Sequence, residues 1–593
     1  MGCSIRNPKS AIRNFIACRR LRRRGTLAPM SQSLARLVFA VTAAFFAAFF
    51  IWPVLQILQG GFIDADGRVT FAYLGALLAD PTYVGGLRTS FLLACATTTL
   101  ALLLALPLAV VSDRFTFPGK KLLGSLVLIP MILPPFVGAI GIKQIFGQYG
   151  ALNALLHHLG VIAPGATVDW FAANQFWGVV LVEALSLYPI IYLNAVAALA
   201  NIDPALEEAA QNLGCTGLRR FWKITLPLIR PGLFAGGTIV FIWSFTELGT
   251  PLIFDYDRVT SVQIYYGLKD IGGNPFPFAL VAVMLACSVG IYALSKGLFG
   301  RASYSMMAKA TSAGGPRSLP AARAWVCTAL FAGVTFVAVL PHLGVLLVAF
   351  SQDWYGTVFP QNYTVDNFRL ALGHDLTVPA IANSLRFASI STVVDLVLGV
   401  LIAYVVVRSK IAGRQVLDFL AMLPLAVPGL VLAFGYLAMS QDGKLFSFLN
   451  PTRDPTILLV IAYSVRRLPY VVRSAAAGFQ QTSETLEEAA QNLGCPPFKS
   501  MLKITLPLIT ANLIAGGLLA FAFAMLEVSD SLILAQKQAF YPITKAILEL
   551  FQLLGDGKFI ASALGVWAMI FLGVVITGLS LILGRKLGAI FRV

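Results

Sequence analysis

Twelve apolar segments, each long enough to cross a membrane as a helix, constrain the fold of this chain more than any other feature. A helix needs about 20 apolar residues to cross the hydrocarbon core of a bilayer. Over 593 residues, 58% are apolar and only 12% are charged, which excludes a soluble enzyme and a disordered scaffold. We therefore expect an all-α polytopic membrane protein. The segments are 34–58, 89–111, 122–142, 174–199, 229–254 and 277–299, then 324–350, 384–407, 416–439, 456–478, 509–535 and 559–584.

Positive charge is concentrated on alternate connecting segments. Seven of these segments hold 29 of the 44 Lys and Arg residues but only seven of the 27 acidic residues. Cytoplasmic loops of membrane proteins carry such an excess, so we expect these segments and both termini to face the cytoplasm. The net charge of +17 then indicates orientation, and nucleic acid is not an expected partner. The segments are 1–36, 112–121, 200–230, 296–325, 408–414, 476–510 and 585–593.

The two halves of the chain are copies of one another. Residues 207–233 and 487–513 are identical at 17 of 27 positions, at an offset of 280. Upstream the offset is 294, and it pairs Arg114 with Arg408 and Gly141 with Gly435. The first half therefore carries about 14 extra residues, which we place in the external loop at 143–173. Because each half has six segments, an even number, we expect a parallel repeat with a cavity between the halves.

These boundaries define four regions. A basic N-terminal tail covers 1–33, the first six-helix half 34–300, a cytoplasmic linker 301–323 and the second six-helix half 324–593. Met30 is an alternative start to Met1. Within the third segment of each half, paired prolines are expected to break the helix. These are Pro130 and Pro134, and Pro424 and Pro428.

The repeated cytoplasmic stretch predicts a short helix that ends at a glycine. Asp203-Pro204 and Thr482-Ser483 offer N-terminal caps, and Gly214 and Gly494 end the helix. A narrow apolar stripe on such a helix suits a groove in another protein. An ordinary amphipathic loop is the alternative for a single copy, but two near-identical copies favour docking. The stripe is Leu206, Ala209, Ala210 and Leu213, repeated as Leu486, Ala489, Ala490 and Leu493.

Both copies fit the pattern E-A-A, three residues, G, nine residues, I, one residue, L-P, and this pattern resembles the EAA loop of binding-protein-dependent ABC importer permeases. It runs from Glu208 to Pro227 and from Glu488 to Pro507. The fused halves, with VRRLPYVVRSAAAGFQQ at 465–481, look most like the ferric iron transport permease family. The resemblance implies that the loops couple to an ATPase through Glu207, Glu208, Ala209, Ala210 and Gly214, and Glu487, Glu488, Ala489, Ala490 and Gly494.

The resemblance also implies partners. The chain has no GxxxxGK[ST] phosphate-binding loop, so ATP and Mg are expected in a separate cytoplasmic ATPase, in two copies, and the chain itself is not expected to be an enzyme. A periplasmic binding protein would deliver the cargo, and lipid would surround the chain in a bacterial inner membrane. The related branch also includes permeases for phosphonates, sugar phosphates, sulfate and polyamines. An ion-driven secondary transporter is the alternative from another class.

Charged residues inside the apolar segments point to the substrate path. Glu247 and Glu527 are equivalent in the repeat, and Asp530 follows one turn later. All three are candidates for guiding a cation such as Fe³⁺, unless they extend to the membrane interface or cap the end of a helix. Arg466 and Arg467 would instead suit a phosphate-bearing or phosphonate anion, unless they pair structurally with the other half or with carbonyl groups. Neither the seven Cys nor the four His suggest a metal centre, so no metal ligand is assigned.

Overall fold

The computed structural model describes residues 32–64, 66–163, 165–171, 175–268, 274–305 and 317–583, and it is almost entirely helical there. In this part of the chain nine helices are long and apolar enough to span a membrane, and two further bent pairs bring the number to eleven. The helix α21 (Thr456–Gln481), which carries Arg466, Arg467 and Arg473, is the counterpart of the span α9 (Gln175–Ala200). Together with α21, the nine helices and the two bent pairs account for the twelve predicted segments. The N-terminal tail and Met30 lie outside the described residues.

The elements occur in the same order in both halves. In the first half they are α2 (Gln32–Phe46), η1 (Ala47–Ile51), α3 (Trp52–Phe62), α4 (Ala72–Ala79), α5 (Pro81–Arg114), α6 (Lys120–Leu126), η2 (Ile129–Ile132), α7 (Pro135–Phe146), α8 (Ala151–His158), α9, α10 (Pro204–Asn212), α11 (Gly217–Arg220), η3 (Phe221–Thr225), α12 (Leu226–Phe245), α13 (Gly249–Ile253), α14 (Thr260–Gly267) and α15 (Phe276–Ser305). The additional helix α8 lies in the loop that we expected to be longer in this half.

The second half contains α16 (Ala321–Ala349), α17 (Asp366–Gly373), α18 (Thr377–Arg408), α19 (Arg414–Met422), η5 (Leu423–Leu425), α20 (Gly429–Met439), η6 (Ser447–Leu449), α21, α22 (Glu484–Asn492), α23 (Pro497–Ser500), η7 (Met501–Thr505), α24 (Leu506–Met525), α25 (Ser529–Leu534), η8 (Gln538–Phe540), α26 (Ile543–Phe551) and α27 (Gly557–Leu583). Two short ribbons complete the described fold: β1 (Phe115–Thr116) pairs parallel with β2 (Arg317–Ser318), and β3 (Ser351–Asp353) antiparallel with β4 (Asn362–Tyr363).

The predicted proline breaks in the third span of each half are present. The chain bends by 97° between Met131 and Pro135 and by 102° between Leu425 and Gly429. Proline removes a helical hydrogen bond and clashes with the preceding turn, so paired prolines end the helix and start a new one. Each break leaves non-helical backbone at the same depth in the two halves.

The fifth span of each half is also broken, which the sequence did not predict. We expected continuous helices over 229–254 and 509–535. Instead α12 ends at Phe245 and α13 begins at Gly249, while α24 ends at Met525 and α25 begins at Ser529. Glu247 and Glu527 lie in these breaks, where a carboxylate can accept hydrogen bonds from the first amides of the following helix.

The first span of each half packs on the third span of the other half. In the first pair α3 contacts α20, and in the second α16 contacts α7. Small residues permit this approach: a Cβ at Gly141 would lie 2.3 Å from the carbonyl oxygen of Pro341, and one at Gly435 would lie 2.9 Å from that of Pro53. The two halves are therefore interlocked and do not simply lie side by side.

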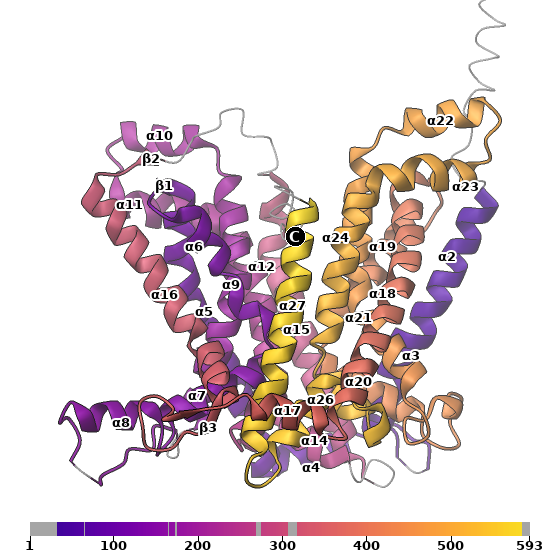
Figure 1. Ribbon diagram of the computed structural model, residues 1–593. Coiled ribbons are helices and arrows are strands. Elements are labelled where there is room, and N and C mark those ends of the chain that lie inside the picture. Colours follow the sequence, from indigo (N-terminus) through magenta and orange to yellow (C-terminus); the bar gives the residue numbers. More distant parts are fainter. Residues whose placement is uncertain are drawn as a thin grey trace, which may run out of the picture.

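The structure as a whole diverges at one end. In Figure 1, α10 and α22 lie at the same end of the molecule on opposite sides, and the helices of the two halves spread apart toward them. At the opposite end α14, α17 and α26 bring the halves together. The segments predicted to be cytoplasmic include the stretches that contain α10 and α22.

Candidate functional site

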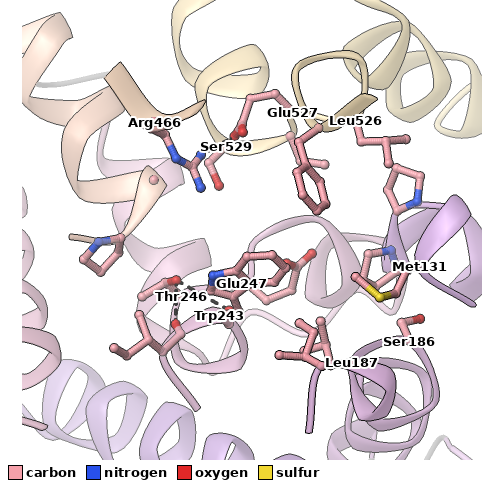
Figure 2. Close-up of a pocket in the computed structure, with 18 of the residues that line it drawn as sticks. Met131, Ser186, Leu187, Trp243, Thr246, Glu247, Arg466, Leu526, Glu527 and Ser529 are labelled. Atoms are coloured by element: carbon pink, nitrogen blue, oxygen red, sulfur yellow. Dashed lines mark hydrogen bonds and ion pairs between the residues drawn. The ribbon is translucent and has the colours of Figure 1, made fainter. Parts of the chain in front are cut away.

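A cavity of about 160 Å³ lies between the two halves. Equivalent elements of both halves form its walls: the breaks of the third spans, the middle of α9 and α21, and the breaks after α12 and α24. In Figure 2, Glu247 lies across this cavity from Arg466 and Glu527. The structure thus brings Glu247, Glu527, Arg466 and Arg467 together as lining residues, and Asp530 lies directly behind them.

The wall from the second half is an ionic network. Glu527 accepts from Arg466 Nη1 and from Arg467 Nη2, so each of its carboxylate oxygens has a guanidinium partner. Asp530 Oδ2 lies 3.5 Å from Arg466 Nη1. Arg467 also donates to the carbonyl oxygen of Phe523 (3.2 Å) and stacks over that ring. The two arginines are thus ion-paired with acids of their own half. The structural alternative to an anion site that we expected was a pairing with the other half or with carbonyl groups, and of these the structure has the bond from Arg467 to the Phe523 carbonyl.

The wall from the first half carries two carboxyl groups without an arginine. The repeat places Ser186 and Leu187 where the second half has Arg466 and Arg467. Glu247 Oε1 accepts long hydrogen bonds from the amide (3.3 Å) and hydroxyl (3.4 Å) of Thr250, one turn later, and the backbone amide of Gly249 also bonds this carboxylate. Glu183 is fully buried in α9 and also lines the cavity. The two walls of the cavity therefore differ in charge: the wall of the second half is ion-paired, and the wall of the first half carries carboxyl groups without an arginine.

Glu183 was not identified from the sequence as a site residue. Its Oε2 accepts from Ser244 and, at 3.4 Å, from Thr97, whereas Oε1 has no hydrogen-bond partner among the described residues. A signal was available, because Glu183 is the single charged residue between 174 and 199. An ionisable side chain in the middle of an apolar span costs free energy, so its presence there marks a candidate functional residue.

We call the repeated loops at 203–227 and 482–507, which are predicted to dock an ATPase, the first and second docking loops. The first docking loop is held to the membrane-spanning helices by its first glutamate. Asp203 caps α10 by accepting from the amide of Ala205 (3.0 Å), as predicted. Glu207 forms an ion pair with Arg114 at the end of α5 and accepts from Thr225 Oγ1 (2.7 Å). Gly214 follows the helix with a φ of 77°, in the left-handed region that ends helices.

The second docking loop repeats this anchoring. Ser483 caps α22, and Glu487 accepts from Arg408 Nε (3.4 Å) and Thr505 Oγ1 (2.8 Å). Tyr404 adds a third hydrogen bond to Glu487 (3.1 Å). The first glutamate of each EAA loop therefore faces the protein, and the arginine and threonine that hold it occupy equivalent positions in the two halves.

Most of the remaining predicted coupling residues lie at the surface of the loops. Glu208, Glu488, Ala209 and Ala489 are exposed, whereas Ala210 is buried and Ala490 half-buried. Beside them Leu213 and Leu493 are 88% and 90% exposed. These two leucines directly follow α10 and α22 at matching positions of the repeat.

At the other end of the molecule, side chains link the halves below the cavity. Lys545 in α26 donates to the hydroxyl of Tyr265 in α14 (3.3 Å) and pairs with Glu549 (3.0 Å). Burial lowers the pKa of Lys545, but Tyr265 and Glu549 raise it, and the net pKa lies above the usual lysine value. Lys558 of α27 likewise donates to Gln144 of the first half (3.1 Å). These contacts close this end.

Several curated proteins resemble this chain along most of its length. It is 27% identical over 524 residues to the putative ferric transport system permease protein FbpB 1 of Haemophilus influenzae, covering 84% of this chain and 77% of that protein. It is 27% identical over 512 residues to the ferric transport system permease protein FbpB of Actinobacillus pleuropneumoniae, covering 81% and 69%. A putative 2-aminoethylphosphonate transport system permease, PhnU of Salmonella typhimurium, is 27% identical over 250 residues, covering 42% and 86%.

The model of one protein family matches the chain twice, once in each half. The matched residues are 101–303 and 395–588, which together make up more than half of the sequence and contain both docking loops and all the cavity-lining charges. This double match agrees with the internal repeat, and it leaves the ion-driven carrier without support. The chain belongs to the family of binding-protein-dependent transport system inner membrane components, and it is a fused two-half permease of an ABC importer.

Proposed function

We propose that this permease imports ferric iron, delivered by a periplasmic binding protein and driven by two copies of a cytoplasmic ATPase that bind ATP and Mg. One ATPase would dock on each EAA loop, so that α10 and α22 face the cytoplasm and the Lys545 end faces the periplasm. In this proposed orientation, the halves are apart at the cytoplasmic end and joined at the periplasmic end, which is the arrangement of an inward-facing state (Figure 1).

The docking loops support the ATPase part of this proposal. A loop that transmits force must be ordered and firmly tied to the helices that move. Arg114 with Thr225, and Arg408 with Thr505, tie each loop to the ends of two membrane-spanning helices. The same loops expose Leu213 and Leu493 to the solvent. An ATPase that closes on ATP would therefore move both halves together.

The charges around the cavity support a cation as cargo. Four carboxyl groups lie in or behind its walls, on Glu183, Glu247, Glu527 and Asp530, against the guanidinium groups of Arg466 and Arg467. Because Glu527 and Asp530 occupy both arginines, little positive charge is left for an anion. Fe³⁺ is a hard cation that prefers oxygen ligands, and two of the relatives carry ferric transport in their names.

Uptake by cells tests this assignment. A strain without the gene would be complemented with the wild-type chain and supplied either with radiolabelled iron as ferric citrate or with radiolabelled 2-aminoethylphosphonate. We expect iron uptake to return and phosphonate uptake to stay at the level of the deletion strain. Restored phosphonate uptake without iron uptake would overturn the ferric assignment.

A further inference from the structure

We propose that the cargo cation is held on one wall of the cavity only, by Glu247 and by Glu183. This inference rests on the proposed cation-import function and names the side chains that carry it out. The equivalent wall of the second half, with Glu527 at its centre, is neutralised and serves as structure. The two halves are thus alike in fold and unlike in chemistry.

The asymmetry follows from substitutions at equivalent positions. Arg466 and Arg467 of α21 face the cavity where α9 has Ser186 and Leu187. As a result Glu527 is 4% exposed and bonded through both oxygens, whereas its counterpart Glu247 is partly exposed and has no cationic partner among the described residues. A carboxylate that two guanidinium groups already hold is a poor ligand for a third cation, because its lone pairs and its charge are in use.

Glu183 supplies the second carboxyl group of this wall. It is fully buried, it lines the cavity, and its Oε1 lacks a hydrogen-bond partner among the described residues. An unsatisfied buried carboxylate oxygen costs free energy, which a passing cation would offset. Ser244 and Thr97 hold the other oxygen, so the group has a fixed position. The repeat puts Tyr463 at the equivalent position in the second half, where no carboxyl group exists.

The site is suited to transient binding of a cation during transport and not to stable chelation of a metal ion. Among the described residues no three His, Cys, Asp or Glu side chains come close enough together to chelate a metal ion. Two carboxyl groups, with the hydroxyls of Ser186 and Thr246 also lining the cavity, offer a partly hydrated trivalent cation oxygen ligands on one side only. Such a cation binds when the outer end opens and leaves when the cavity opens to the cytoplasm.

Trp243 provides a direct probe of binding, since it lines the cavity and lies beside Glu247 in Figure 2. The full chain would be purified with its ATPase and titrated with Tb³⁺, a trivalent cation whose luminescence is sensitised by a nearby indole. We expect a saturable signal in the wild type, at least a tenfold weaker apparent affinity in Glu183→Gln and in Glu247→Gln, and partial recovery in Glu183→Asp. Trp243→Phe should remove the signal, which assigns it to this cavity.

Asp395→Asn is the matched control. Asp395 is as buried as Glu183 and has two oxygens without a hydrogen-bond partner in the described part of the chain, but it does not line the cavity. We expect this variant to bind Tb³⁺ within twofold of the wild type. Equal Tb³⁺ affinity in Glu183→Gln and the wild type would overturn the inference.

Iron uptake by the same variants separates this inference from the proposed function. If the wild type restores iron uptake and Glu183→Gln and Glu247→Gln match it at equal membrane levels, the one-walled site is wrong while ferric import stands. If the wild type restores no iron uptake, the proposed function fails. A Tb³⁺ signal that still depends on Glu183 would then support a site for another cation.

Discussion

Arg408, the last residue of α18, lies with its Nε 3.4 Å from Oε1 of Glu487 in the docking helix α22, and both side chains are buried. Arg114 and Glu207 form the same pair in the first half, between α5 and α10. These contacts connect the surface that we assign to ATPase docking with the second span of each half. They make the glutamate that precedes the E-A-A sequence an anchor, while the glutamate of that sequence, Glu208 or Glu488, is exposed.

Removal of this anchor should loosen the docking loop. In Arg408→Ala, Glu487 stays buried without its cation, which typically costs about 3–5 kcal/mol. We expect faster hydrogen–deuterium exchange in peptides that cover α22 and at least a tenfold loss of iron uptake. Lys410→Ala, at an exposed position two residues away, is the control and should leave both unchanged. An unaltered exchange rate in Arg408→Ala would show that the pair does not order the loop.

Docking itself should depend on the exposed leucines. In Leu213→Asp with Leu493→Asp, a carboxylate would be buried without a partner on assembly, and we expect a loss of about 2 kcal/mol per site, or roughly 30-fold in affinity. The measurement is co-purification of the ATPase with the tagged permease. Leu554→Asp is the control, because Leu554 is 99% exposed in the loop between α26 and α27, at the opposite end. Full recovery of ATPase with the double variant would exclude this surface.

The sequence predicted most of the fold because span length and loop charge depend on neighbouring residues alone, and because the repeat is visible when the chain is aligned with itself. These signals predicted the helices, the repeat and the proline breaks at Pro130 and Pro424. The breaks after Phe245 and Met525 have no proline or glycine at the break itself to announce them. They depend on tertiary contacts, including the hydroxyls of Ser261 and Thr544, which bond the carbonyl oxygens of Glu247 and Glu527.

The candidate site was only partly predictable for the same reason. Glu247, Glu527, Arg466 and Arg467 could be named as charges in apolar spans, but whether Arg466 faces an acid of its own half, of the other half or a substrate depends on helix packing. Likewise Arg114 and Arg408 were visible as repeat matches, yet nothing in the sequence assigns them to Glu207 and Glu487 across more than 70 residues. The pairing depends on the tertiary structure.

Gly141 should not tolerate a larger side chain, because it lies where the two halves interlock. A Cβ there would meet the carbonyl oxygen of Pro341 at 2.3 Å and the amide nitrogen of Val345 at 2.7 Å, both main-chain atoms that cannot rotate away. We expect Gly141→Ala to lower stability by about 1–3 kcal/mol, seen as a lower melting temperature of the purified protein. Gly290→Ala in α15, where a Cβ meets open space among the described residues, should leave it equal or higher. Equal melting in the two variants would contradict this packing.

The contact between Lys545 and Tyr265 should hold the periplasmic end closed. In Lys545→Met the hydrogen bond between the halves is lost, worth about 1 kcal/mol, or roughly a fivefold rise in the outward-open population. An impermeant thiol reagent added outside should therefore label Ser529→Cys in the cavity about five times faster, in a background without other reactive cysteines. Lys444→Met, at an exposed external position, should not change the rate.

The pH dependence of this labelling distinguishes the lysine from other groups. Because the pKa of Lys545 in the folded protein lies above its ordinary value, the charged form that stabilises the contact is present at all lower pH values. The contact is lost only as the pH rises through that raised pKa, beyond about 10.4. Ionisation of the cysteine thiol affects both backgrounds alike, so the ratio of the labelling rates of Ser529→Cys with and without Lys545→Met should stay constant between pH 6 and 9. A rate in Lys545→Met equal to that of the unsubstituted chain would mean that other contacts close the periplasmic end.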